Sequence, residues 1–169
     1  MESREICSKS VVLLLGSNDE AASEIIRRAL EVIFLTVGSE VRTSAEYRSE
    51  AYGFSSEREF INRATEITTV CDAYEVLRRI NLIEALLGRD RDEEARVRSE
   101  KGEMYASRPI DIDIVFYGDH SYDDHLLTIP YHFLDERTYA LRPVAEIAGN
   151  RRHPALSQTP AEMLAKYDK

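Results

Sequence analysis

Short apolar runs and helical spacing alternate along the first part of the chain. Residues 11–15 are continuously apolar and end at Gly16, which is typical of a strand in the centre of a sheet. Apolar residues then recur every three or four positions, which predicts an amphipathic helix that ends near Gly38. These helical positions are Ala22, Ile25, Ile26, Ala29, Leu30 and Ile33.

The pattern then predicts a strand, a loop, another strand and another helix. Polar and apolar residues alternate over 41–47, which predicts a strand, and the polar stretch 49–59, which contains Gly53, predicts a loop. Residues 60–70 are rich in Ile, Thr and Val and predict a further strand. Asp72 and Glu75 form a start similar to a capping box, and the helix that follows is expected to end at Gly88.

The remaining sequence is less regular. Residues 89–108 show no periodicity, and about 20 structureless residues in a compact domain are typical of a functional lid or a disordered segment. A strand is predicted over 110–117, with a turn beginning at Gly118. Near the C-terminal end, Thr159, Pro160 and Glu162 supply the N-cap, the first-turn proline and the closing glutamate of a capping box.

The order of these elements predicts the fold class. A β-α-β-β-α-β order followed by helical pieces is typical of an α+β sandwich of ferredoxin-like type, here with mobile loops and additional C-terminal helices. A chain of 169 residues fits one domain, and we expect its core to span about residues 10–165. The composition, 43% hydrophobic and 31% charged, is that of an ordinary globular protein.

Charge and cysteine content narrow the expected partners and location. The net charge is −9, and residues 89–108 hold six basic and six acidic residues, so no basic stripe for nucleic acid is formed. The apolar run 11–15 cannot span a bilayer. Cys7 and Cys71 lie outside any CxxC motif, which favours reduced thiols. We expect a cytoplasmic protein that binds neither nucleic acid nor membranes, with no obligatory protein partner evident.

The strand predicted over 110–117 carries two carboxylates. Successive side chains point to opposite faces and rise ~3.3 Å per residue. Ile110, Ile112 and Ile114 therefore share one face, and Asp111 and Asp113 share the other. Two carboxylates at this spacing suit one or two Mg²⁺ ions, which keep substrate phosphates among their ligands. The alternative is a pair of acids on a solvated face, balanced by the arginine just upstream.

Arginines precede this strand and extend the hypothesis. Phosphoryl transfer depends mainly on positioning and charge stabilisation, so metal ions and arginines together form a coherent site. The alternative for these arginines is a solvated, self-paired charge run. The absence of GxxxxGK[ST] and GxGxxG from the sequence argues against Walker-type and Rossmann sites, and the four histidines lack zinc-ligand spacing.

Seven short motifs, all in the same order, match one known family. The matching runs are LGSN (15–18), YRSEAYGF (47–54), FIN (60–62), LGRDR (87–91), RPIDIDI (108–114), LTIP (127–130) and PVAEIA (143–148). The sequence therefore resembles the 6-hydroxymethyl-7,8-dihydropterin pyrophosphokinase family of folate biosynthesis over almost its whole length. RPIDIDI followed by LTIP is the most specific part of this resemblance, whereas GSN alone is weak.

The resemblance implies that pyrophosphate is transferred from ATP to the hydroxymethyl group of the pterin, with release of AMP. It implies two Mg²⁺ ions held by Asp111 and Asp113, with Asp111 also near the attacking hydroxyl. The implied catalytic residues are Arg89, Arg91, Arg108 and Asp111. The implied pterin-binding residues are Ser49, Gly53, Phe54, Phe60, Asn62, Tyr105 and Tyr139. The implied nucleotide-binding residues are Glu84, Ile114, Leu127, Thr128, His132 and Arg137.

The chain departs from the family pattern at three positions. Family members often have Pro and Trp where this chain has Ala51 and Tyr52. After the LTIP run the family usually shows His, whereas this chain has Tyr131, with His132 one position later. These departures fall in the implied pterin loop and beside the implied nucleotide contacts.

Some alternatives stay open at the level of sequence. Arg96 and Arg98 form a motif similar to that of Arg89 and Arg91, so either pair can supply the lid arginines. Two other functions are compatible with the pattern: a non-catalytic ligand-binding module of the same fold, and a different Mg²⁺-dependent phosphotransferase that acts on another alcohol. Product identification after incubation with ATP separates these functions.

Overall fold

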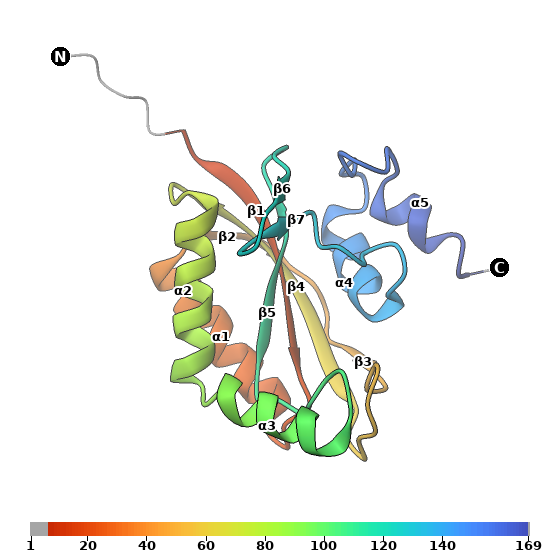
Figure 1. Cartoon of the computed structure of the whole chain (residues 1–169). Helices are drawn as coiled ribbons and strands as arrows, with labels where there is room; N and C mark the ends of the chain where they lie inside the picture. Colours follow the sequence, from red (N-terminus) through yellow and green to blue (C-terminus); the bar gives the residue numbers. More distant parts are fainter. Residues whose placement is uncertain (1–6, 169) are drawn as a thin grey trace.

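The sheet and helices of this α+β protein are shown in Figure 1, a computed structural model that describes residues 7–168. Helices cover both faces of an antiparallel sheet, and this mixture of helices and sheet confirms the α+β class predicted from the sequence. In chain order the elements are β1 (Lys9–Ser17), α1 (Ala22–Thr36), β2 (Ser39–Thr43), β3 (Tyr47–Ser49), β4 (Phe60–Thr69), α2 (Ala73–Leu86), α3 (Arg91–Lys101), β5 (Asp111–Tyr117), β6 (Tyr122–Asp123), β7 (Thr128–Ile129), α4 (Thr138–Ala148) and α5 (Pro160–Leu164).

Strand β1 lies in the interior of the main sheet, whose order is β2-β4-β1-β5, with β3 also paired to β4. It pairs antiparallel with β4 on one side and with β5 on the other. The apolar run 11–15 lies within β1 and is almost completely buried. The prediction of a central strand is therefore confirmed.

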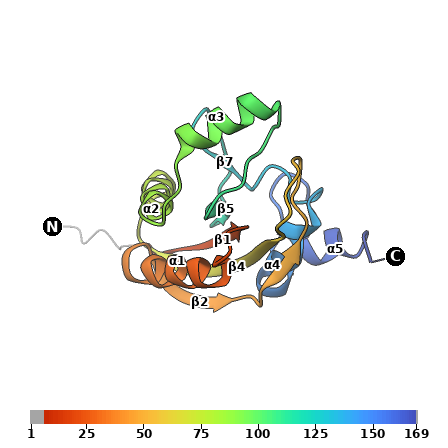
Figure 2. The same cartoon turned by 90° about the horizontal axis from the view of Figure 1, so that it is seen from below.

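The two faces of the sheet pack against different helices. Val11, Leu13 and Leu15 of β1 belong to one apolar cluster, which also contains the buried residues of α1 and α2. Val12 and Leu14 belong to a second cluster, formed mainly with α4. Figures 1 and 2 show α1 and α2 on one side of the sheet and α4 and α5 on the other. Alternation along β1 thus places successive side chains in separate cores.

Most predicted elements are confirmed to within a residue or two at their ends. The predicted strands over 60–70 and 110–117 correspond to β4 and β5. Asp72 caps α2, because its side chain accepts a hydrogen bond from the backbone N–H of Glu75 at 2.9 Å. Thr159 and Glu162 form the predicted capping box of α5, with Pro160 in its first turn. These starts are encoded locally, so sequence reasoning finds them.

The prediction of one strand over 41–47 is wrong. The chain forms β2 and β3 instead, separated by residues 44–46. The side chain of Ser44 is buried and accepts a hydrogen bond from the backbone N–H of Ala64 at 2.9 Å. The Arg63 side chain donates to the backbone oxygen of Ser44 at 2.7 Å. The Ser44 side chain therefore replaces one backbone hydrogen bond of the ladder, while the backbone N–H of Ser44 still donates to Ala64 at 2.8 Å.

The prediction that residues 89–108 have no regular structure is also wrong, because they contain α3. The Asp90 side chain caps this helix by accepting hydrogen bonds from two backbone N–H groups, and Gly102 ends it with φ at 66°. Arg96 pairs with Glu93 and Glu100 on the exposed side. Caps and ion pairs stabilise a helix without an apolar stripe, so apolar periodicity does not reveal it.

The helices are of ordinary length, with 15 residues in α1. Within residues 7–168, none combines the length and the apolar character needed to cross a membrane.

Candidate active site

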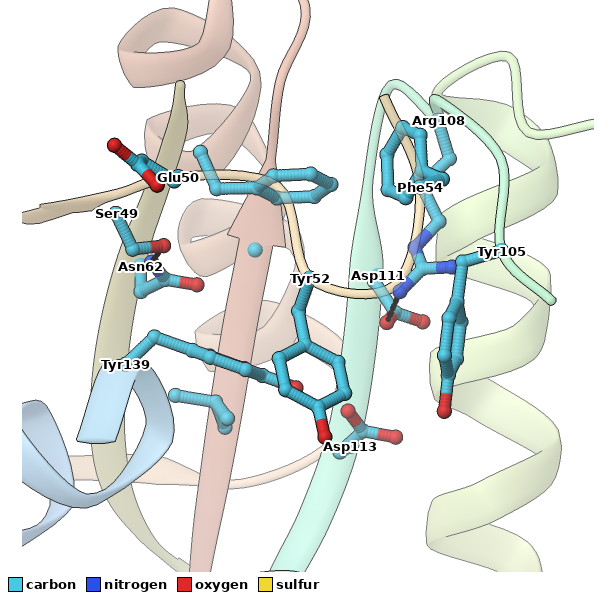
Figure 3. A pocket seen from close by; sticks show the side chains of 13 residues that line it. Ser49, Glu50, Tyr52, Phe54, Asn62, Tyr105, Arg108, Asp111, Asp113 and Tyr139 are labelled. Atoms are coloured by element: carbon cyan, nitrogen blue, oxygen red, sulfur yellow. Dashed lines mark hydrogen bonds and ion pairs between the residues drawn. The ribbon is translucent and has the colours of Figure 1, made fainter. Parts of the chain in front are cut away.

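A pocket opens on the face of the sheet that α4 covers, and about 480 Å³ of space within it, which includes space open to solvent, is free of protein atoms. It lies where β1 ends and β4 and β5 begin, beneath the 50–59 loop and the segment after α3 (Figure 3). The lining residues are Leu14, Gly16, Ser49, Glu50, Tyr52, Phe54, Phe60, Asn62, Tyr105, Arg108, Asp111, Asp113 and Tyr139. This lining of aromatic rings with a few polar groups suits a planar molecule that bears hydrogen-bonding atoms.

The floor of the pocket is formed by three neighbouring strands. In the sheet register, Gly16 of β1 lies opposite Asn62 of β4 and also opposite Asp111 of β5. A Cβ atom on Gly16 would lie 3.3 Å from Oδ1 of Asn62, so a larger residue there would crowd the amide. Glycine therefore keeps the floor open between the amide and the carboxylate. Sequence reasoning treated this glycine only as punctuation and as part of a weak motif, although glycine inside a strand was a usable signal.

Aromatic side chains form the walls of the pocket. The rings of Phe54 and Phe60 are 6.1 Å apart and nearly perpendicular, and Tyr52 lies 6.3 Å from Tyr105. Tyr139 of α4 lies 6.1 Å from Tyr52 and faces the floor residues in Figure 3. Most of these rings were predicted, and the structure brings them together. Tyr52 was noted only as a departure from the family, yet it lines the pocket with the others.

The polar residues Asn62 and Glu50 lie beside these rings, and a neighbouring side chain holds the Asn62 amide. The Asn62 side chain is buried and donates to Oγ of Ser49 at 2.8 Å. Glu50 also lines the pocket and had no assigned role from sequence. Gly53 has φ at 76°, and a Cβ there would lie 2.7 Å from the Tyr105 ring. The glycine therefore permits both the backbone turn and the close approach of that tyrosine.

Two carboxylates of β5 face into the pocket, as the alternation along the strand predicted (Figure 3). Asp111 accepts hydrogen bonds from Arg89 at 2.6 Å and pairs with Arg108 at 2.7 Å. Burial and the negative charge of Asp111 raise the pKa of Asp113 to about 8, and Arg108 opposes this increase only partly. An additional cation between the two carboxylates would therefore favour the ionised form of Asp113.

The predicted lid arginines differ in their surroundings. Arg89 is buried between three carboxylates, because it contacts Glu84, Glu94 and Asp111. Arg91 is exposed and donates to Glu84. Glu84 is itself buried and accepts a hydrogen bond from the backbone N–H of Ile112 at 2.7 Å. Burial raises the pKa of Glu84, against the opposing charge of Arg89. The structure thus links the predicted nucleotide residue Glu84 to the predicted catalytic arginines.

The alternative lid arginines lie further along α3. Arg96 pairs with Glu93 and Glu100 of its own helix and is exposed. Arg98 is half-buried on the same helix. Of these four arginines, Arg89 is the one that contacts a pocket carboxylate among the interactions of the described residues. The choice of Arg89 and Arg91 over Arg96 and Arg98 stays a prediction, and this contact supports it.

Arg137 is buried in a cluster of tyrosines beside the pocket. Its guanidinium donates to the hydroxyls of Tyr131, Tyr139 and Tyr105 at 2.8, 3.0 and 2.9 Å, respectively. It also lies 4.1 Å from the ring centre of Phe133. Burial raises the pKa of Tyr131, so its hydroxyl stays protonated at neutral pH. The tyrosine that replaces the usual histidine of the family is therefore part of a network with Arg137 and the pocket residues Tyr105 and Tyr139.

The remaining predicted nucleotide residues lie outside the set that lines the pocket. Ile114 and Leu127 are buried in the apolar cluster of α1 and α2. Thr128 is exposed on β7, and His132 is exposed with its ring 4.5 Å from that of Phe133. The assignment of these residues to the nucleotide stays a prediction.

The fold and the site together define a class of protein. An α+β sheet presents an aromatic pocket with two carboxylates, and two arginines contact one of them, as expected of a transferase that moves phosphate groups to a planar substrate. The model of the 7,8-dihydro-6-hydroxymethylpterin-pyrophosphokinase family matches residues 12–149. The chain belongs to this family.

Individual relatives agree with the family match. The chain is 34% identical to the 2-amino-4-hydroxy-6-hydroxymethyldihydropteridine pyrophosphokinase of Methylorubrum extorquens, over 91% of this chain and 90% of that protein. It is 30% identical to the Synechocystis sp. protein of the same name, over 93% of this chain and 75% of that protein.

A solved structure supports the fold. The crystal structure of Plasmodium falciparum HPPK-DHPS matches with a TM-score of 0.72 and 17% identity, over 98% of this chain. This chain corresponds to 46% of that longer chain, so the likeness concerns only part of it.

Proposed function

We propose that this chain transfers pyrophosphate from ATP to the hydroxymethyl group of 6-hydroxymethyl-7,8-dihydropterin in folate biosynthesis. The alcohol oxygen attacks the β-phosphorus, the bond between that phosphorus and the oxygen bridging it to the α-phosphorus breaks, and AMP leaves. The alcohol proton is released to solvent in the same reaction. The observation that carries the proposal is one pocket that holds an aromatic slot, the Asn62 amide and the Asp111 and Asp113 carboxylates.

The pterin is proposed to lie in the aromatic slot. Phe60 and Tyr139 stack on the ring, and Phe54 and Tyr105 close it from the loops. The Asn62 amide faces the ring edge, which bears both donors and acceptors, and Ser49 holds that amide in place at 2.8 Å. The turn at Gly53 positions the loop that carries these contacts. Binding in a slot closes water out of the reaction and orients the hydroxymethyl group toward Asp111.

Two Mg²⁺ ions are proposed to bind at Asp111 and Asp113. The carboxylates of Asp111 and Asp113 both line the pocket, and these two groups would supply the protein donors. Such a donor set fits Mg²⁺, which takes oxygen ligands and completes its shell with substrate phosphates and water. The raised pKa of Asp113 fits the same role, because a cation would favour its ionised form. When bound, the metal stabilises negative charge on the transferred phosphates.

The protein's own cations are proposed to hold the triphosphate. Arg89 and Arg108 contact Asp111 at the edge of the pocket, and Arg91 contacts Glu84, which also pairs with Arg89. Their guanidinium groups stabilise the charge that builds up on the phosphates as AMP departs. The nucleotide contacts are proposed to come from Glu84, Ile114, Leu127, Thr128, His132 and Arg137.

The proposal also covers the fold type, the domain organisation and the cellular location of the chain. The order β2-β4-β1-β5, with α1 and α2 on one face, supports a ferredoxin-like arrangement extended by α4 and α5. A single pyrophosphokinase domain is proposed for the chain. Cys7 and Cys71 are both free thiols, which supports a reducing compartment such as the cytoplasm.

Identification of the nucleotide product tests this function. The protein is incubated with ATP, Mg²⁺ and 6-hydroxymethyl-7,8-dihydropterin, and the nucleotides are separated by chromatography. We expect AMP, formed only when the pterin is present. Formation of ADP would instead indicate a simple kinase. If ATP binds and no nucleotide is converted, the chain is a binding module and the catalytic proposal fails.

A further inference from the structure

Helix α3 buries one charged side chain beside the proposed phosphate site. Glu94 is the single buried residue of this 11-residue helix, and its side chain is 8% exposed. No other strand or helix among the described residues packs extensively against α3. Burial of a carboxylate is unfavourable unless a cation compensates it. The compensating cation is Arg89, whose Nε and Nη2 donate to the two Glu94 oxygens at 2.8 and 3.2 Å.

The hydrogen-bonding capacity of Arg89 is almost fully used. A guanidinium has five N–H groups, and four of those on Arg89 point to carboxylates. Two of these four donate to Glu94, and Nη1 donates to both Glu84 and Asp111. Only one N–H of Nη2 remains. A bidentate contact with a phosphate needs two parallel N–H groups, so one carboxylate must first leave Arg89.

The three carboxylates differ in how easily they can leave. Glu84 is 1% exposed and also accepts a hydrogen bond from the backbone N–H of Ile112. Displacement of Glu84 would therefore leave this buried N–H without a hydrogen-bond partner. Asp111 is fixed on β5, within the main sheet. Glu94 lies on a helix whose other residues are not buried and whose ends are capped by Asp90 and Gly102. This helix can move as a unit at small cost.

We infer that Glu94 is a positioning residue that competes with the nucleotide for Arg89. While no nucleotide is bound, its carboxylate takes the Nε and Nη2 edge of Arg89 and holds that side chain against Asp111. Binding of ATP exchanges Glu94 for phosphate on this edge. The inference rests on the proposed function, because it assigns Arg89 to the nucleotide. It predicts that Glu94 weakens nucleotide binding and has no direct contact with the pterin.

The test replaces Glu94 by its neutral isostere and measures binding of a non-reacting nucleotide. In α,β-methylene-ATP a carbon replaces the bridging oxygen of the bond that the reaction breaks, so this analogue binds without turnover. With Mg²⁺ present, we expect calorimetry to show that Glu94→Gln binds the analogue about threefold to tenfold more tightly than the natural protein. A change of this size corresponds to the weakening of one charge-assisted hydrogen bond. The KM for ATP is expected to fall, whereas the KM for the pterin stays unchanged.

Glu93→Gln is the matched control. Glu93 lies on the same helix with a side chain that is 52% exposed, and it pairs with Arg96 instead of Arg89. Its replacement removes the same charge at a similar place, so a change confined to Glu94→Gln reports the contact with Arg89. We expect Glu93→Gln to alter the affinity for the analogue by less than about twofold, because an exposed ion pair contributes little free energy.

Different results would contradict different parts of the account. If folded Glu94→Gln binds the analogue as the natural protein does, or more weakly, Glu94 does not compete and the inference is wrong. If Glu94→Gln does not fold, Glu94→Asp is measured instead, because its shorter side chain weakens the same contact and must also tighten binding. If the natural protein itself binds no nucleotide, the proposed function fails, whatever the variants do.

Discussion

Asp113→Asn is expected to reduce turnover by at least about 1,000-fold. A metal site contributes several kcal/mol of charge stabilisation, and each 1.4 kcal/mol corresponds to about tenfold in rate. An amide has no negative charge to offer a cation, so the replacement removes one of the two proposed Mg²⁺ ligands. Asn has nearly the same shape as Asp, so we expect the residues that line the pocket to keep their positions.

The same variant is expected to fold at least as stably as the natural protein. The folded-state pKa of Asp113 is raised to about 8, so without metal the ionised form is disfavoured in the folded state. Stability of the metal-free protein is therefore lost as pH rises from the ordinary carboxyl range toward 8, where Asp113 ionises beside Asp111. Asp113→Asn cannot ionise and avoids this loss. The difference between the two proteins should vanish at low pH.

Steady-state rates and thermal unfolding in the absence of metal check both statements. Asp123→Asn is the matched control, because Asp123 is an exposed carboxylate on β6 outside the pocket. We expect the control to retain its normal rate. The loss of one metal ligand should reduce the rate by more than about tenfold. If Asp113→Asn keeps a rate within that range of the natural protein, the metal assignment is wrong.

Arg89→Ala is expected to lower both stability and activity. The side chain of Arg89 is 7% exposed and compensates the buried Glu84 and Glu94. Removal of one partner of a buried ion pair costs about 3–5 kcal/mol in the free energy of unfolding. Turnover is expected to fall as well, because the proposed phosphate contact is lost. Denaturant unfolding and steady-state rates measure the two effects separately.

Arg96→Ala is the control for this second experiment. Arg96 pairs with Glu93 and Glu100 on an exposed helix face, and such pairs are worth only about 0.2–0.5 kcal/mol each. We expect its removal to leave the rate unchanged. The opposite pattern, with turnover lost in Arg96→Ala and retained in Arg89→Ala, would transfer the lid role to the second arginine motif.

Local and periodic features of the fold could be predicted from the sequence. The continuous apolar run 11–15 predicted the buried β1, because a strand covered on both faces needs apolar residues on both. Alternation along β5 placed Asp111 and Asp113 on one face, opposite the buried Ile112 and Ile114. The caps at Asp72 and Thr159 were found because their contacts span three residues. The identity of the substrate came from motif resemblance alone.

Features that depend on contacts between distant segments could not be predicted. Helix α3 was missed for another reason: it has no apolar stripe, and its local signals were the caps at Asp90 and Gly102 and the ion pairs of Arg96. Glu94 is buried against Arg89, five residues earlier, and Arg89 is itself held by Asp111 of β5, which is distant in the sequence. The tyrosine cluster around Arg137 joins Tyr105, which follows α3, to Tyr131 and Tyr139 near α4. Apolar periodicity does not reveal contacts between segments that are distant in the sequence.

The fate of the pterin is the most direct test of the central claim. After incubation with ATP and Mg²⁺, the recovered 6-hydroxymethyl-7,8-dihydropterin is examined by mass spectrometry, and AMP is quantified in the same sample. The account predicts a pterin that carries two phosphates, with one AMP formed for each modified molecule. A pterin with one phosphate, or AMP accompanied by free pyrophosphate and an unmodified pterin, would contradict it.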